Sequence, residues 1–156
     1  MSFEALYKAY WPKIFRLCRS YVNDPDLAQD LAQETFIKVW QQLPRFRHEA
    51  AIGTWIFRIA VNQCLRQLEK EQRFPRTEMP VNLPEEPATA LEPQLQFLYH
   101  CIGELAELDR LIISLELEAL NQADIATIVG LSPANVRVRI HRIKEKLTNQ
   151  FKHYEP

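Results

Sequence analysis

The stretch that decides the fold lies near the end of the chain: "NQADIATIVGLSPANVRVRIHRIKEKL", Asn121 to Leu147. Residues 122–129 can form a short helix, and Gly130 follows at the position where a left-handed residue ends a helix. Ser132 can cap a second helix that has Pro133 at its first position. In that helix one apolar stripe recurs at helical spacing: Val136, Ile140, Ile143 and Leu147. The stretch therefore predicts a helix-turn-helix.

The face opposite this stripe is rich in basic side chains. Arg137, His141 and Arg142 project from it together with Ala134 and Val138, and Arg139 lies on its flank. Arginine pairs with guanine edges and with phosphates, so this face suits entry into the major groove of DNA. The alternative is a solvated basic face, but the cap and the glycine turn at matching spacing favour DNA binding.

The composition predicts a soluble, all-α protein without catalytic chemistry. The chain has 156 residues, 47% of them hydrophobic, only 3 Gly, and a formal net charge of −1. The sequence contains no phosphate-binding loop and no spaced metal ligands, and the cysteines Cys18, Cys64 and Cys101 stand far apart. We therefore expect no enzyme activity, cofactor or metal. No apolar run reaches the roughly 18 residues of a membrane span, so we expect a cytoplasmic protein.

A proline-rich, acidic segment divides the chain. Five of the ten prolines in the chain fall in "FPRTEMPVNLPEEPATALEP", residues 74–93, and a segment so rich in proline cannot form a helix or a central strand. We predict two small helical domains, 1–73 and 94–156, joined by this linker. In the first domain, helices are expected over 2–22 with a kink or break near Pro12, over 25–43, and over 51–72. In the second, they are expected over 94–105 and 107–120, followed by the helix-turn-helix.

The first domain carries its own basic surface. Polar residues Arg58, Asn62 and Arg66 share one face of the third predicted helix, and the loop before it holds Arg45, Phe46, Arg47 and His48. Basic residues interleaved with an aromatic can hold single-stranded DNA by phosphate contact and base stacking. The alternative, a solvated helix face, stays open on this pattern alone. Trp55 is expected more in the core than against DNA.

Two motifs together extend this reading. "DLAQETFIKVWQQLPRFRHEAAIGTWIFRIAVNQCLRQL" (Asp30 to Leu68) and, after the linker, "DIATIVGLSPANVRVRIHRIKEKL" resemble bacterial sigma factors of the extracytoplasmic-function (ECF) group. These proteins are promoter-specificity subunits of RNA polymerase with two helical domains. The resemblance covers nearly the whole chain, in the right order. It implies an alternative sigma factor that binds core polymerase, selects promoters and assists their melting.

The resemblance also assigns a role to each surface. The second helix would bind the coiled coil of the largest core polymerase subunit through Asp30, Gln33, Glu34, Ile37 and Gln41. The loop with Arg45, Phe46, Arg47 and His48, followed by Arg58, Asn62 and Arg66, would bind the minus-ten element of promoter DNA and capture a flipped base. The minus-thirty-five element would be read by Ser132, Ala134, Asn135, Arg137, Val138, Arg139, His141 and Arg142, with residues 132–135 near phosphate.

Further expectations concern regulation and specificity. The resemblance implies an anti-sigma factor as a partner, and a linker that either threads toward the polymerase active-site channel or serves as a plain tether. Several positions depart from the family pattern: Asn121, Gln122 and Ala106 replace residues common there, Val138 replaces a usual small polar residue, and His141 varies. These departures concern the promoter sequence and leave the fold unaffected.

Two other functions compete with this one. A self-sufficient helix-turn-helix regulator with an N-terminal dimerisation domain would bind duplex DNA unaided, as a dimer on a palindrome. A purely protein-binding helical adaptor would leave the stripes around Arg58 and Arg137 without a purpose. Charge reversal in those stripes would then be harmless.

Overall fold

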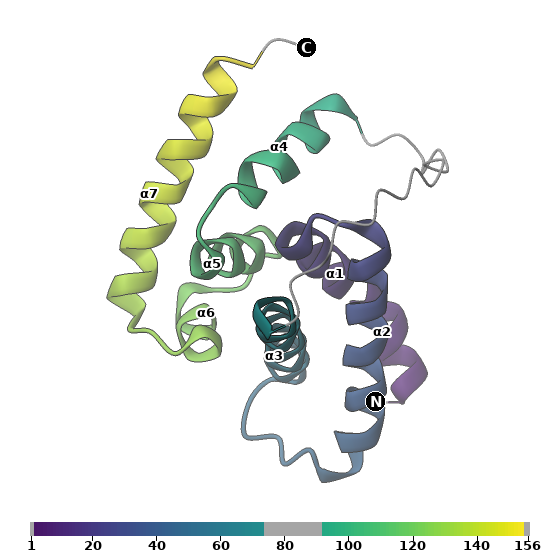
Figure 1. Cartoon of the computed structure of the whole chain (residues 1–156). Helices are drawn as coiled ribbons and strands as arrows, with labels where there is room; N and C mark the ends of the chain where they lie inside the picture. The colour runs from purple at the N-terminus through teal and green to yellow at the C-terminus, as the bar shows by residue number, and fades with distance from the viewer. Residues whose placement is uncertain (1, 74–91, 155–156) are drawn as a thin grey trace.

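The computed structural model describes residues 2–73 and 92–154, and these residues are almost entirely helical (Figure 1). One 3-10 turn, η1 (Leu43–Arg45), follows the second helix. The α-helices are α1 (Phe3–Val22), α2 (Pro25–Gln42), α3 (Ile52–Arg73), α4 (Pro93–Gly103), α5 (Glu107–Leu117), α6 (Gln122–Val129) and α7 (Pro133–Lys152). The all-α class predicted from the sequence is thereby confirmed. Over the described ranges, no helix is both long and apolar enough to cross a membrane.

Side-chain caps define the ends of the first two helices. Ser2 Oγ accepts a hydrogen bond from the amide of Ala5, as its position before α1 predicts. Asn23, with φ 51°, ends α1 in the left-handed conformation. Asp24 then caps α2 by accepting from the amides of Asp26 and Leu27 at 3.0 and 3.3 Å. Of the kink or break predicted near Pro12, the break is wrong, because α1 continues through this exposed proline as a single helix.

A close contact sets the position at which α3 crosses α1. A Cβ atom added at Gly53 would lie 2.7 Å from the hydroxyl oxygen of Tyr10, so a larger residue there would require the Tyr10 ring or the start of α3 to shift. Tyr10 also packs edge-to-face against Phe57, with ring centroids 6.4 Å apart. The start of α3 and the loop that precedes it are therefore placed by α1.

The helix-turn-helix of the sequence prediction is present as α6 and α7. Gly130, with φ 77°, ends α6, and the amides of Gly130 and Leu131 both donate to the carbonyl of Ala126. Ser132 Oγ accepts from the amide of Asn135 and caps α7. The predicted stripe is buried in full: Val136, Ile140, Ile143 and Leu147. This stripe packs α7 against α5 and α6.

The two halves of the chain pack directly on each other, which the sequence did not predict. Helix α1 contacts α4 and α5, and α3 contacts α6, so the buried residues form one continuous core (Figure 1). Arg16 on α1 makes two hydrogen bonds to Glu118 after α5, Nε to Oε1 at 2.8 Å and Nη2 to Oε2 at 2.9 Å. Arg110 donates to the backbone carbonyl of Tyr21 at 3.0 Å, and its guanidinium lies 4.9 Å from the Tyr21 ring centroid.

The predicted linker falls almost wholly outside the described residues. Residues 74–91 are not described, so the structure does not test whether this segment threads toward a channel or acts as a tether. At its end, Glu92 occupies the N-cap position and Pro93 the first turn of α4. The helix therefore begins one residue earlier than predicted, since proline fits the first turn, where its missing N–H costs no hydrogen bond.

Candidate nucleic-acid and protein interfaces

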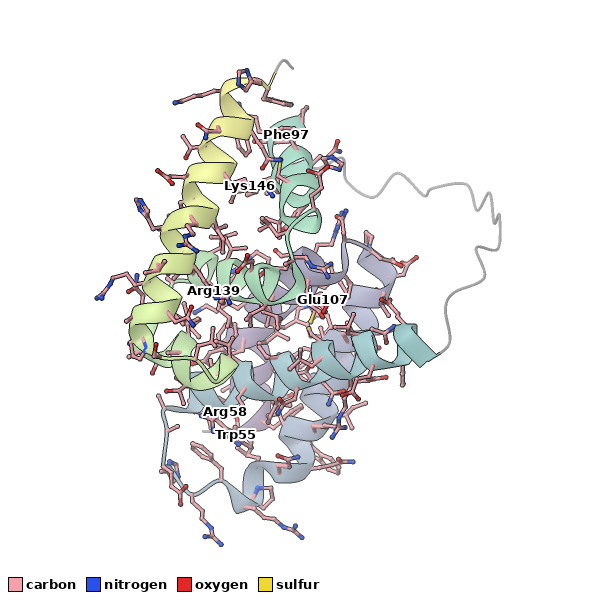
Figure 2. The ribbon with its side chains drawn as sticks, turned by 60° about the vertical axis from the view of Figure 1, so that its left-hand side comes forward. Trp55, Arg58, Phe97, Glu107, Arg139 and Lys146 are labelled. Carbon is pink, nitrogen blue, oxygen red and sulfur yellow. The ribbon has the colours of Figure 1, made fainter. Side chains whose placement is uncertain are left out.

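The loop between α2 and α3 forms one side of an open cavity that is lined by basic and aromatic side chains. The cavity has a volume of 450 Å³ and is lined by Gln42, Arg45, Phe46, Arg47, Glu49, Ala50, Trp55 and Arg58. Phe46 lies against Trp55, with ring centroids 4.8 Å apart, so the two rings form one apolar wall. Figure 2 shows Trp55 and Arg58 next to each other on the part of α3 nearest this loop. Guanidinium groups beside an aromatic wall suit a stacked base with its phosphate.

The structure brings together some of the residues predicted for this surface and separates others. Arg45, Phe46, Arg47 and Arg58 all line the cavity, as expected. His48 packs edge-to-face on Phe46 at 4.6 Å, but it lines a neighbouring hollow of 720 Å³ together with Leu6 and Ile52. Asn62 and Arg66 are exposed further along α3 and do not line the cavity.

Sequence reasoning underestimated Trp55. This side chain is partly buried against the core, as expected, and it also lines the cavity, so a role against DNA stays a prediction. The sequence-based prediction also missed Gln42 and Glu49, two polar residues that line the cavity on either side of the basic run 45–48. Glu49 could have been found from the sequence, because it directly follows residues 45–48 in the loop that was predicted to bind DNA.

The outer face of α7 presents most of the predicted duplex-contacting residues to solvent. Exposed side chains on this helix and its cap include Ser132, Ala134, Asn135, Arg137, Val138, His141 and Arg142. His141 Nε2 lies 3.8 Å from a carboxylate oxygen of Glu145, one turn further along the same face. The face therefore has basic flanks around a small apolar centre.

Arg139 is the member of this set that the structure places differently. Its Nη1 donates to Asp109 on α5 at 3.1 Å and its Nε donates to Asn135 at 3.0 Å, so it ties α7 to α5 (Figure 2). Lys144, which lies on the same helix, similarly donates to Glu116 at 3.1 Å. These contacts orient α7, whereas Arg137 and Arg142 remain exposed.

The exposed face of α2 is the third candidate surface. Asp30, Gln33, Glu34, Ile37 and Gln41 are all exposed, as predicted, and Ile37 is 55% exposed. The structure adds Trp40, which the sequence reading omitted although it is 63% exposed and lies one turn from Ile37. Two large apolar side chains held in water amid acidic and amide groups indicate a surface for a protein partner.

The three cysteines are buried in the hydrophobic core. The hydrogen bond with Cys18, together with burial, raises the pKa of the Cys64 thiol well above its ordinary value, so the thiol stays protonated. Burial likewise raises the pKa of Cys101. Among the residues that the structure describes, none of the His, Cys, Asp and Glu side chains gather into a group that could hold a metal ion.

A helix-turn-helix, a basic aromatic cavity and an apolar-acidic helix face define a transcription protein that binds both DNA and a protein. The chain matches the Sigma-70 region 2 family over residues 6–74 and the Sigma-70 region 4 family over residues 96–147. It is 32% identical to the ECF RNA polymerase sigma-E factor of Haemophilus influenzae, over 96% of this chain and 87% of that protein. It is 33% identical to the RNA polymerase sigma-H factor of Pseudomonas aeruginosa, over 94% and 84%.

Solved structures agree with these sequence matches. The sigma factor RpoE of Bartonella quintana, in complex with the anti-sigma factor NepR, superposes with a TM-score of 0.81 at 23% identity over 98% of both chains. CnrH in complex with the cytosolic domain of CnrY gives 0.75 at 26% identity, over 98% of this chain and 89% of that one. The chain therefore belongs to the ECF group of the sigma-70 family.

Membership of this family settles the broad function. The protein is an alternative sigma factor that directs RNA polymerase to promoters, and the self-sufficient regulator is not favoured. Sigma factors are generally not enzymes, in line with the recognition surfaces described above.

Proposed function

We propose that the three surfaces divide promoter recognition between them. The exposed face of α2 binds the coiled coil of the largest core polymerase subunit, and α7 reads the minus-thirty-five element. The cavity of the α2–α3 loop takes a base flipped from the minus-ten element. The observation that carries this proposal is the Phe46–Trp55 wall, with 4.8 Å between ring centroids, in an open cavity that three arginines also line.

Base capture explains how such a protein assists melting without an active site. Flipping a base out of the duplex costs a few kcal/mol of unstacking and unpairing. Stacking on an aromatic side chain returns about 1–3 kcal/mol per base. Arg45, Arg47 and Arg58 add phosphate or base-edge contacts, so the cavity can offset most of the unstacking cost and bias the duplex toward opening.

The distance between the two promoter elements requires the halves of the chain to separate. Elements named for positions minus ten and minus thirty-five lie about 25 base pairs apart, or roughly 85 Å along B-DNA at about 3.4 Å per base pair. A compact chain of this length has a radius of gyration of about 15 Å and is roughly 40 Å across. The α1–α5 contact must therefore open before both elements are bound on one promoter.

We further infer a partner that holds the halves together. Of the two solved structures described above, one is a sigma factor in complex with the anti-sigma factor NepR, and the other is CnrH in complex with the cytosolic domain of CnrY. Their superposition covers 98% of this chain, both halves included, so the packed arrangement found here resembles the arrangement in those complexes. An anti-sigma factor that binds the packed form would keep the chain from RNA polymerase in the cytoplasm until it is released.

Run-off transcription tests the proposed function. Purified protein and bacterial core polymerase are incubated with a pooled genomic promoter library, and each component is omitted in turn. Transcripts that need both components and start downstream of a shared two-part sequence are the expected result. Tight duplex binding by the protein alone, without core-dependent initiation, would refute the proposal in favour of a self-sufficient regulator.

A further inference from the structure

The centre of the DNA-facing side of α7 is apolar. Val138 is 46% exposed, and Ala134, one turn earlier on the same face, is also exposed. The buried residues Val136 and Ile140 stand two positions before and after Val138, so they point about 200° away around the helix. Val138 therefore lies opposite the core of the helix-turn-helix and faces the same side as the reading residues.

The fold gives Val138 no packing role in this position. A β-branched residue loses side-chain freedom in a helix, so an exposed valine weakens α7 slightly relative to alanine or a long polar residue. Its nearest neighbours on the outer face are Arg137, His141 and Arg142, and Glu145 lies two turns further along, all of them exposed. An apolar strip framed mainly by basic side chains differs from a protein-docking face such as that of α2, where the apolar residues lie among acidic and amide groups.

The chemistry of the major groove identifies what such a strip can contact. Of the four standard bases, only thymine presents an apolar group there, its C5-methyl, and apolar side chains contact it. The stiff χ1 of valine holds its two methyl groups in a fixed direction, and the small Ala134 leaves room for a base edge beside them. Arg137 and Arg142 can hold neighbouring guanines or phosphates and so fix the register.

We propose that Val138, with Ala134, reads the methyl group of a thymine in the upstream promoter element. This proposal rests on the proposed function of α7. It makes Val138 a specificity-determining residue and predicts a thymine, on either strand, at one fixed position of the element.

Removing single methyl groups from the DNA tests the proposal. Holoenzyme is assembled on a promoter obtained from the run-off library, and each thymine of its upstream element is replaced in turn by deoxyuridine, which lacks only the C5-methyl. We expect one replacement to weaken binding about fourfold, the equivalent of one methyl group removed from contact. The Val138→Ala holoenzyme, in which only alanine methyl groups remain on this strip, should show a much smaller difference between the two DNAs than wild type, and Val138→Thr, which keeps one methyl of the valine, should lie between them.

The matched control is Leu117→Ala, which removes an exposed apolar side chain (52% exposed) from α5, outside the proposed interfaces. It should preserve the difference between thymine and uracil. Equal binding of all deoxyuridine promoters by wild type overturns the proposal, as does a difference that is undiminished in Val138→Ala or an upstream element without a fixed thymine. Failure to form any promoter-specific holoenzyme would instead reject the proposed function itself.

Discussion

Replacing Arg16 by alanine should weaken the contact between the two halves of the chain. Arg16 donates two hydrogen bonds, at 2.8 and 2.9 Å, to Glu118, whose side chain is only 7% exposed. Glu118 stands at the C-cap of α5, where the helix dipole disfavours a carboxylate and Arg16 offsets it. The hydrogen bond to Glu118 also holds the pKa of Arg16 above its ordinary value.

The size of the effect follows from the exposure of the two partners. Removing one partner of a fully buried ion pair costs about 3–5 kcal/mol, whereas an exposed pair contributes about 0–1 kcal/mol. Glu118 is nearly buried but Arg16 is 50% exposed, so water can reach the carboxylate once the arginine is gone. We expect Arg16→Ala to lower the free energy of unfolding by about 1–2 kcal/mol, between these limits. Glu118→Gln should cost less, because it also removes the charge that the α5 dipole disfavours.

Urea unfolding followed by far-ultraviolet circular dichroism measures both effects. In thermal unfolding, each kcal/mol of lost stability lowers the melting temperature of a chain of this size by about 2–4 °C. The melting temperature of Arg16→Ala should therefore fall by roughly 2–8 °C. The matched control is Arg66→Ala, which removes an exposed arginine from α3. A loss in Arg16→Ala no larger than in this control, or a larger loss in Glu118→Gln, would refute the reasoning about this contact.

The other predictions concern one buried hydroxyl and two of the proposed interfaces. Among the described residues the Tyr21 hydroxyl is buried without a hydrogen-bond partner, so Tyr21→Phe should leave stability unchanged or raise it by up to about 1 kcal/mol in urea titrations. Burial raises the pKa of Tyr21 to about 12 from 10.0. The wild type should therefore lose stability as the pH rises from 10 toward 12, and Tyr21→Phe should lack this component of the loss. Asp30→Lys with Glu34→Lys, and separately Trp40→Ala, should abolish or weaken core polymerase binding in a pull-down while the circular dichroism spectrum stays native; unaltered affinity would exclude the α2 face. Arg137→Ala and Arg142→Ala should each cost about 1–3 kcal/mol in holoenzyme binding to the upstream element if the arginine makes a bidentate base contact. Unchanged promoter selectivity in both would contradict the assignment of α7.

Local chemistry explains why most of the helices could be predicted from the sequence. Ser2, Asp24 and Ser132 precede helices and cap them through their own side chains, and Gly130 adopts the left-handed conformation that the turn requires. Each of these features depends on residues within three or four positions of the cap. The break expected near Pro12 failed because packing of the flanking turns of α1 outweighs the hydrogen bond that one proline removes.

The candidate sites were predictable to the extent that they follow helix periodicity. The exposed faces of α2 and α7 follow from the 3.6-residue repeat, and so does the buried stripe that begins at Val136. The cavity of the α2–α3 loop does not, because Phe46 and Trp55 meet only where the loop folds back on the start of α3. The fold of this loop also separates two neighbours in the sequence: His48, with φ 58°, lines a different hollow from Arg47.

By itself the sequence determined the helical class, the order of the two halves, the helix-turn-helix and the family resemblance, because these depend on short-range spacing and composition. Only the tertiary structure decided that the halves pack on each other, that Arg139 holds α7 to α5, and that Trp55 joins the wall of a cavity. Arg16 and Glu118 are 102 positions apart. No local pattern connects two such residues, and their contact depends on the sum of the apolar burial that brings α1 onto α5.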